Sequence, residues 1–217
     1  MHKTIFWIYI LACSANLIAQ LIPAEELNSY TKPLLMPILL FYVYRKSIGK
    51  TTLNVLLLSA ALLFSWFGDV VLMYQANDSY FIAGIGLFLI AQVIYIIVLR
   101  KATYLKPIFN LRKIIPFLLY GAILFYVLLP AGTFTIPIVI YGIVILWMLI
   151  SAFNRKHFTP YDSYVYAFIG SALFVLSDSI LAINAFKTAI PYAGFFIMST
   201  YCAAQYLLAE GILKHVE

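Results

Sequence analysis

The chain has 217 residues, of which 65% are hydrophobic and only 10% are charged. A soluble domain carries about 25% charged residues, and no polar stretch here is long enough to form one. The net charge of +6 does not indicate a nucleic-acid partner, because the basic residues lie in short clusters between apolar runs, as in cytoplasmic loops. The two cysteines, Cys13 and Cys202, both lie in apolar runs and are too few for a disulfide framework or a metal site.

Apolar runs of near-membrane length recur along the whole sequence, which predicts an all-α, multi-pass membrane protein. We expect one integral membrane domain over residues 1–217. Its eight transmembrane helices are predicted at residues 4–22, 32–45, 51–74, 80–99, 113–130, 134–152, 161–185 and 190–213. The second is short and is predicted to begin at Lys32-Pro33, because proline is tolerated in the first turn of a helix.

Lysine and arginine set the expected orientation in the membrane. Of the 14 such residues, only Lys32 and Lys187 fall on one side of the eight-span topology. The other side holds Lys3, Arg45, Lys46, Lys50, Arg100, Lys101, Lys106, Arg112, Lys113, Arg155, Lys156 and Lys214. Because basic loops face the cytoplasm, both termini are expected there. The compact size and short loops favour the inner (cell) membrane of a bacterium.

The two halves of the chain carry a similar motif. Gly68-Asp69-Val70-Val71-Leu72 and Ser177-Asp178-Ser179-Ile180-Leu181 both read small residue, Asp, any residue, β-branched residue, Leu. Ala91-Gln92 is echoed by Ala204-Gln205. The pattern suggests two parallel four-helix repeats, residues 1–106 and 107–217, related by an axis along the membrane normal. Coincidence among apolar residues is the alternative.

Asp69 and Asp178 are the acidic residues that lie inside predicted spans and away from their ends. An Asp at a helix centre costs about 2.5–3.5 kcal/mol on insertion scales, and no basic residue is expected at this depth to neutralise it. If their helices are neighbours, both carboxylates face one cavity in the outer half of the membrane. Two such groups share a proton and supply an acid and a base for chemistry with water. Glu210, near the end of the last span, is instead expected to pair with Lys214, four residues later.

Other interpretations of the two aspartates remain open. Each carboxylate could hydrogen-bond a neighbouring helix, and Ser65 and Ser171 are local partners for such a structural role. A proton-coupled membrane transporter could also use the same two aspartates. An intramembrane aspartyl protease is disfavoured, because its Gly-x-Gly-Asp motif would need glycine where this sequence has Trp66.

Several polar residues are candidates for binding a substrate in the same cavity: Lys32, Gln92, Tyr95, Tyr141, Ser177, Asn184, Tyr201 and Gln205. For each one, a helix–helix hydrogen bond is the simpler interpretation. Lys32 lies on the outer side with both aspartates, where it can meet a lipid phosphate or merely anchor the headgroup region. The three histidines all lie in cytoplasmic segments, so we expect no metal and no other cofactor at the aspartates.

Four segments resemble, in order, the YhhN/lysoplasmalogenase family of multi-pass membrane proteins: Lys32-Pro33-Leu34-Leu35-Met36-Pro37, Gly68-Asp69, Phe174-Val175-Leu176-Ser177-Asp178-Ser179-Ile180-Leu181-Ala182, and Tyr201 with Ala204-Gln205. The resemblance implies hydrolysis of the vinyl ether bond of lysoplasmalogens to a fatty aldehyde and a glycerophospho-headgroup. It implies a lysophospholipid substrate in the bilayer and catalysis by Asp69 and Asp178. The oligomeric state stays open.

Overall fold

The computed structural model describes residues 2–22, 25–50, 52–74, 77–103 and 111–216. These residues form eight α-helices: α1 (His2–Leu21), α2 (Glu25–Lys46), α3 (Leu53–Leu72), α4 (Asp78–Lys101), α5 (Leu111–Leu128), α6 (Thr135–Phe153), α7 (Tyr161–Phe186) and α8 (Ala193–Val216). Two 3-10 helices, η1 (Gly132–Phe134) and η2 (Asn154–His157), flank α6. The described part of the chain contains no strand, which confirms the all-α class.

Local sequence signals define where α3 and α4 begin. The hydroxyl of Thr52 accepts a hydrogen bond from the backbone N–H of Val55, and the side chain of Asn77 accepts one from Ser79. Such N-caps satisfy donors that the first turn of a helix leaves without a partner. Asp78 in the first turn of α4 is also favourable, because it faces the positive end of the helix dipole.

Helix α2 is longer than predicted. It begins at Glu25, seven residues before Lys32, so the predicted start is wrong. The helix passes through Pro33 and Pro37. Because Pro37 has no N–H, the carbonyl of Pro33 lacks its helical partner, and the indole N–H of Trp66 on α3 donates to that oxygen at 2.8 Å. Helix α2 therefore continues through both prolines, because α3 supplies the donor that Pro37 lacks. The ends of the other seven helices lie within three residues of those predicted.

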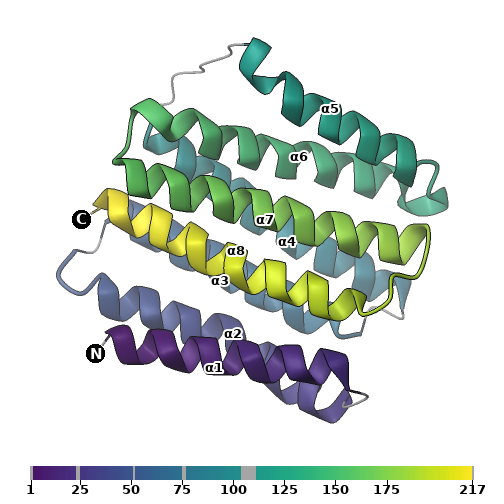
Figure 1. Cartoon of the computed structure of the whole chain (residues 1–217), viewed down its shortest axis with the longest axis horizontal. Coiled ribbons are helices and arrows are strands. Elements are labelled where there is room, and N and C mark those ends of the chain that lie inside the picture. Colours follow the sequence, from purple (N-terminus) through teal and green to yellow (C-terminus); the bar gives the residue numbers. More distant parts are fainter. Residues whose placement is uncertain (1, 23–24, 51, 75–76, 104–110, 217) are drawn as a thin grey trace.

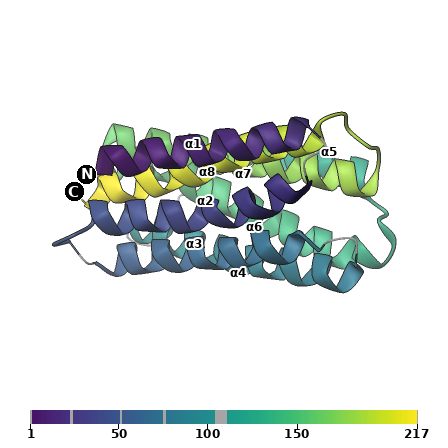
Figure 2. The same ribbon diagram turned by 90° about the horizontal axis from the view of Figure 1, so that it is seen from below.

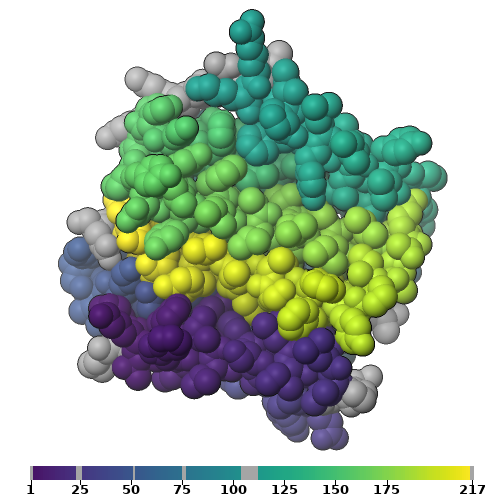
Figure 3. Space-filling view, in the orientation of Figure 1, coloured from purple at the N-terminus to yellow at the C-terminus, as the bar shows by residue number. Residues whose placement is uncertain are grey.

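The helices pack in two layers of four. Contacts place α1, α8, α7 and α5 side by side in one layer and α2, α3, α4 and α6 in the other. Figure 2 shows α1 and α8 on one side of the molecule and α3 and α4 on the other. Helix α5 packs mainly against α6 and α7 and forms one edge of the bundle (Figures 1 and 3). Both termini lie at the same end (Figure 1), which we call the terminal end.

Six helices contact one another in a closed ring, in the order α2, α3, α4, α6, α7, α8. If α2, α3 and α4 are exchanged with α6, α7 and α8, the order of helices around the ring stays the same. Two parallel repeats would require this symmetry. The outer helices break the symmetry, because α1 packs on α2 and α8 whereas α5 packs on α6 and α7. The boundary proposed at 106–107, like Lys106, lies outside the described residues, and the repeats stay a prediction.

The terminal end holds basic residues in two different settings. Glu210 does not pair with Lys214 as expected. It binds Lys46 at 2.8 Å and Tyr42 at 2.6 Å across the helix interface. Arg155, predicted in a cytoplasmic loop, is buried and donates to Ser163 at 2.8 Å. These contacts tie α2, η2, α7 and α8 together at this end.

Five segments of the described chain are long and apolar enough to cross a membrane, judged by length and composition. They are His2–Leu21, Leu53–Leu72, Asp78–Lys101, Gly132–His157 and Tyr161–Phe186. Many large apolar side chains of these helices are exposed on the outside of the bundle, as lipid contact requires. A multi-pass membrane protein follows from this pattern.

Candidate active site

A cavity of about 610 Å³ opens among the helices, away from the terminal end. Asp69 of α3 and Asp178 of α7 both line it. Lys32 of α2 lines the same space, which we call the aspartate cavity. The structure therefore brings together two acidic residues that lie half a chain apart.

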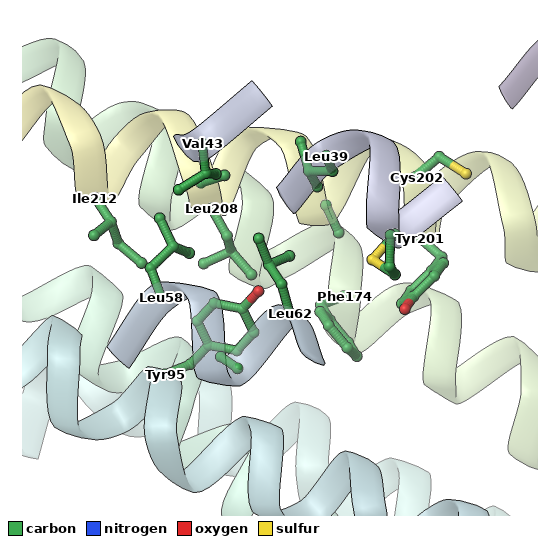
Figure 4. Close-up of a cluster of buried hydrophobic side chains, with 14 of the residues drawn as sticks. Leu39, Val43, Leu58, Leu62, Tyr95, Phe174, Tyr201, Cys202, Leu208 and Ile212 are labelled. Carbon is green, nitrogen blue, oxygen red and sulfur yellow. The ribbon is translucent and has the colours of Figure 1, made fainter. Parts of the chain in front are cut away.

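Asp69 is held by a chain of hydrogen bonds that starts on α4. The Tyr95 hydroxyl donates to the side-chain oxygen of Gln205 at 2.6 Å. The Gln205 amide donates to the hydroxyl of Tyr201 at 3.1 Å, and Tyr201 donates to Asp69 Oδ2 at 2.7 Å. In Figure 4, Leu62 and Phe174 lie between Tyr95 and Tyr201 within one cluster of buried side chains. Tyr201 thus contacts the carboxylate of Asp69 directly, while Gln205 and Tyr95 orient the hydroxyl of Tyr201 through hydrogen bonds.

Asp178 has a tyrosine partner of its own. The hydroxyl of Tyr141 on α6 donates to Asp178 Oδ2 at 2.5 Å. The neighbouring Ser179 donates to the carbonyl of Val175 and accepts from Tyr120 of α5 at 2.8 Å. Each aspartate therefore has one phenol as its direct partner, and no basic side chain is bonded to either carboxylate among the contacts resolved here.

Close packing between α3 and α4 explains why a glycine precedes Asp69. A Cβ added at Gly68 would lie 2.7 Å from the ring of Phe88 on α4. The ring of Phe88 in turn packs edge-on against Phe174 and Tyr201. A small residue at 68 lets α3 and α4 approach at the level of the carboxylate, as is usual between membrane helices.

The cavity has a polar end that the sequence alone did not reveal. Gln20 of α1 and Asn28 and Ser29 of α2 line it together with Lys32. Gln20 donates to Asn28 at 2.8 Å, and Asn16 donates to the same oxygen at 3.1 Å. Asn28 and Ser29 fall between the first two predicted helices, whereas the structure places them in α2, which begins at Glu25. Gln20 lies within the first predicted span, where nothing in the sequence indicates which helix it faces. The side-chain amides of Asn16, Gln20 and Asn28, which are close together in the sequence, could have indicated this polar end.

The other predicted substrate-binding residues lie in different places. Ser177 lines the cavity, but its hydroxyl donates to the carbonyl of Ile197 at 3.0 Å. Gln92 is fully buried on α4 beside Tyr141, and its amide meets no group with good hydrogen-bond geometry in the described structure. Asn184 accepts from the backbone N–H of Ile190 at 2.9 Å and so fixes the α7–α8 connection. Gln92, Asn184, Tyr95 and Gln205 do not line the cavity.

The chemistry available in this cavity is that of carboxyl groups, phenols, amides and one amine. The described residues contain no cluster of three or more His, Cys, Asp or Glu side chains that could hold a metal ion. A phenol can donate to a carboxylate or accept from a carboxylic acid, so each pair suits either protonation state. Such a pair of carboxyl groups can give and remove protons within one cavity.

Comparisons with known proteins give a family and a similar protein. Lysoplasmalogenase TMEM86A from Bos taurus is 29% identical over 160 residues, which cover 72% of this chain and 65% of that protein. The match therefore spans less than two thirds of that relative. No solved structure matches the chain. The model of the YhhN family matches residues 27–212, a range that contains both aspartates, Lys32 and Tyr201. The chain therefore belongs to the YhhN family.

Proposed function

We propose that this protein is a membrane hydrolase that cleaves the vinyl ether bond of lysoplasmalogens or a closely related lysolipid. The observation that carries the proposal is the single cavity lined by Asp69 and Asp178, each with a tyrosine partner. The family and the name of the bovine relative support the same reaction. The products are a fatty aldehyde and a glycerophospho-headgroup.

The first step is proton transfer to carbon. One aspartate, in its acid form, gives its proton to the second carbon of the alkenyl chain, and the double bond supplies the electron pair. The first carbon and its oxygen then share a positive charge, as in the transition state of glycoside hydrolysis. The other aspartate, in its ionised form, stabilises that charge at short range in a site of low dielectric.

Water completes the reaction. The ionised aspartate takes a proton from a water molecule while the water oxygen bonds to the first carbon, which gives a hemiacetal. The hemiacetal releases the glycerol oxygen as an alcohol and leaves the aldehyde. The alcohol takes up the proton that the hydroxyl group loses. The proton that the second aspartate took from water then passes to the first aspartate within the cavity, which restores both carboxyl groups. The net reaction consumes one water molecule.

Lys32 and the amides at the polar end suit the headgroup of such a lipid. Lys32 supplies one positive charge beside the cavity, and a lysine ammonium binds phosphate as a point charge. Gln20 and Asn28 present amides next to it, where the glycerol and phosphate oxygens would lie. In this arrangement the headgroup occupies the polar end and the vinyl ether reaches the aspartates.

We also propose that all eight helices cross the membrane, with both termini in the cytoplasm. The positions of the basic residues at the terminal end support this orientation, because α2, α4 and α8 all carry Lys or Arg in their last turns there. The aspartate cavity then lies toward the outer face of a cell membrane. A lysolipid in that leaflet would present its headgroup to Lys32.

Deuterium incorporation tests the reaction. Purified protein in detergent is given a lysoplasmalogen in D₂O, and the aldehyde is analysed by mass spectrometry immediately after trapping. We expect aldehyde release with one deuterium on the second carbon, because the proton reaches that carbon from an exchangeable carboxyl group. A matched saturated ether lysolipid should not be cleaved. Absence of aldehyde, together with proton flux in liposomes, would replace the hydrolase with a proton-coupled transporter.

A further inference from the structure

A second hollow lies between α5 and α6, with a volume of about 420 Å³. Its walls are mainly apolar and include Ile114, Leu118, Ile143, Trp147 and Ile150. Leu118, Ile143 and Trp147 are about half exposed, so the hollow opens toward the outside of the bundle as a groove. We call it the α5–α6 groove.

The groove adjoins the aspartate cavity, and the two spaces share part of their walls. Gly121, Phe125 and Leu146 line both spaces. The two large side chains occupy notches left by glycines on the facing helix: a Cβ added at Gly121 would meet Leu146, and one added at Gly142 would lie 2.6 Å from Phe125. The glycines therefore let Leu146 and Phe125 lie against the opposite helix at the junction of the two spaces.

The groove runs from this junction toward the terminal end. Its apolar walls end at polar residues, Arg100 of α4 and Ser151 and Asn154 near the end of α6. Tyr141, which marks the level of Asp178, precedes Asn154 by 13 residues, a distance of roughly 20 Å along a helix. An extended hydrocarbon advances about 1.25 Å per carbon, the projection of a carbon–carbon bond of about 1.5 Å, so this distance corresponds to roughly 16 carbons.

We infer that the α5–α6 groove binds the hydrocarbon chain of the substrate, and that its length favours alkenyl chains of about 16 carbons. The inference rests on the proposed function, because it places the tail of the same lysolipid whose vinyl ether reaches the aspartates. The headgroup lies at Lys32, the reacting carbons lie between Asp69 and Asp178, and the chain passes Leu146 into the groove. Each methylene leaves lipid or detergent rather than water, so the groove favours it through packing contacts with its fixed apolar walls.

A variant of Leu118 tests the inference. Leu118 lies one helical turn beyond Gly121, at about the tenth carbon of a chain that starts at Tyr141. In Leu118→Trp we expect kcat/KM for a sixteen-carbon lysoplasmalogen to fall by roughly tenfold, since the indole fills the groove and several methylenes lose their packing contacts. An eight-carbon substrate ends before this point and should be cleaved as by the wild type.

The neighbouring leucine provides the control. Leu119 is 58% exposed and does not line the groove, so Leu119→Trp should leave both substrates unaffected. An unchanged ratio of sixteen- to eight-carbon activity in Leu118→Trp, or an equal change in Leu119→Trp, would overturn the inference.

Photolabelling gives a second readout that requires no catalysis. The wild-type protein is mixed with a saturated sixteen-carbon ether lysolipid that carries a diazirine at the end of its chain. We expect labels on residues of the groove such as Ile114, Trp147 and Ile150. Labels spread over outward-facing residues such as Leu119 and Ile123 would show ordinary lipid contact and overturn the inference. If the groove is labelled but no lysoplasmalogen of any length is cleaved, the proposed reaction fails while the chain-binding groove stands.

Discussion

Tyr201 and Tyr141 each donate a hydrogen bond to one of the two cavity aspartates. A lysine or arginine in their place would fix the carboxylate in its charged form, whereas a phenol serves both the acid and the ionised form. A catalyst that passes protons between two carboxyl groups needs partners of this kind. This suits tyrosine as the hydrogen-bond partner of each aspartate, while the charge of Lys32 lies elsewhere in the same cavity.

Substitution of Tyr201 tests the role of its hydroxyl. In Tyr201→Phe, Asp69 loses its donor while the ring stays packed against Phe88 and Phe174. Hydrogen bonds to charged groups contribute about 1.5–3 kcal/mol, so kcat for aldehyde release should fall by roughly 10- to 100-fold. The measurement is steady-state aldehyde release by purified protein.

The matched control for this prediction is Tyr42→Phe. Tyr42 is also a buried phenol bonded to a carboxylate, that of Glu210, but it lies at the terminal end of the bundle. We expect kcat in this variant to stay within about twofold of the wild type, with lower thermal stability. Equal rates in Tyr201→Phe and the wild type would remove this phenol from the mechanism.

At the scale of the element, α2 depends on a contact from another helix. The N–H of Trp66 satisfies the Pro33 carbonyl that Pro37 leaves without a helical donor. This contact also holds the first turns of α2, and with them Lys32, Asn28 and Ser29, against α3 beside the cavity. The indole of Trp66 and the amides of Asn16 and Gln20 together position this polar end of the cavity.

Trp66→Phe should destabilise this arrangement. A buried carbonyl left without a donor costs about 1–3 kcal/mol, which for a chain of this size lowers the unfolding midpoint by several degrees. The measurement is thermal unfolding in detergent. The control is Trp7→Phe on α1, whose side chain is 62% exposed and faces outward. Identical midpoints for the two variants would show that the Trp66 contact contributes nothing to stability.

The helices could be predicted from the sequence because apolar runs and loop charges mark them directly. The start of α2 could not, because Pro33 resembles a helix start until a donor from another helix is known. A cavity shared by Asp69 and Asp178 was predicted on the condition that their helices are neighbours. Although α3 and α7 are not adjacent in the ring of helices, both carboxylates do line one cavity. Their partners were harder to assign, because the chain has 17 tyrosines and a pattern within one helix does not say which neighbour it faces.

The α5–α6 groove could not be predicted from the sequence, for the same reason. Each of its walls is an ordinary apolar helix face, and the hollow exists only because α5 packs mainly against α6 and α7 at the edge of the bundle. Gly121 and Gly142 are visible in the sequence, but the side chains that fill their notches come from facing helices. Tertiary packing, rather than local propensity, sets this part of the site.

At the scale of the whole molecule, the fold brings one acid from each half of the chain into a common cavity. Asp69 is positioned by α8 through Tyr201, and Asp178 by α6 through Tyr141, so four helices must pack correctly for the pair to form. Groups that act together in one step lose nearly all their effect when either is removed. The two aspartates are therefore expected to behave as one catalytic unit.

The most direct test of this claim compares Asp69→Asn, Asp178→Asn and the double variant for aldehyde release from a lysoplasmalogen, with folding of each checked by size-exclusion chromatography and thermal unfolding. Each single variant should lose at least roughly a thousandfold in kcat, and the double variant should be no slower than the singles. A folded single variant that keeps the wild-type rate would contradict the two-carboxylate mechanism.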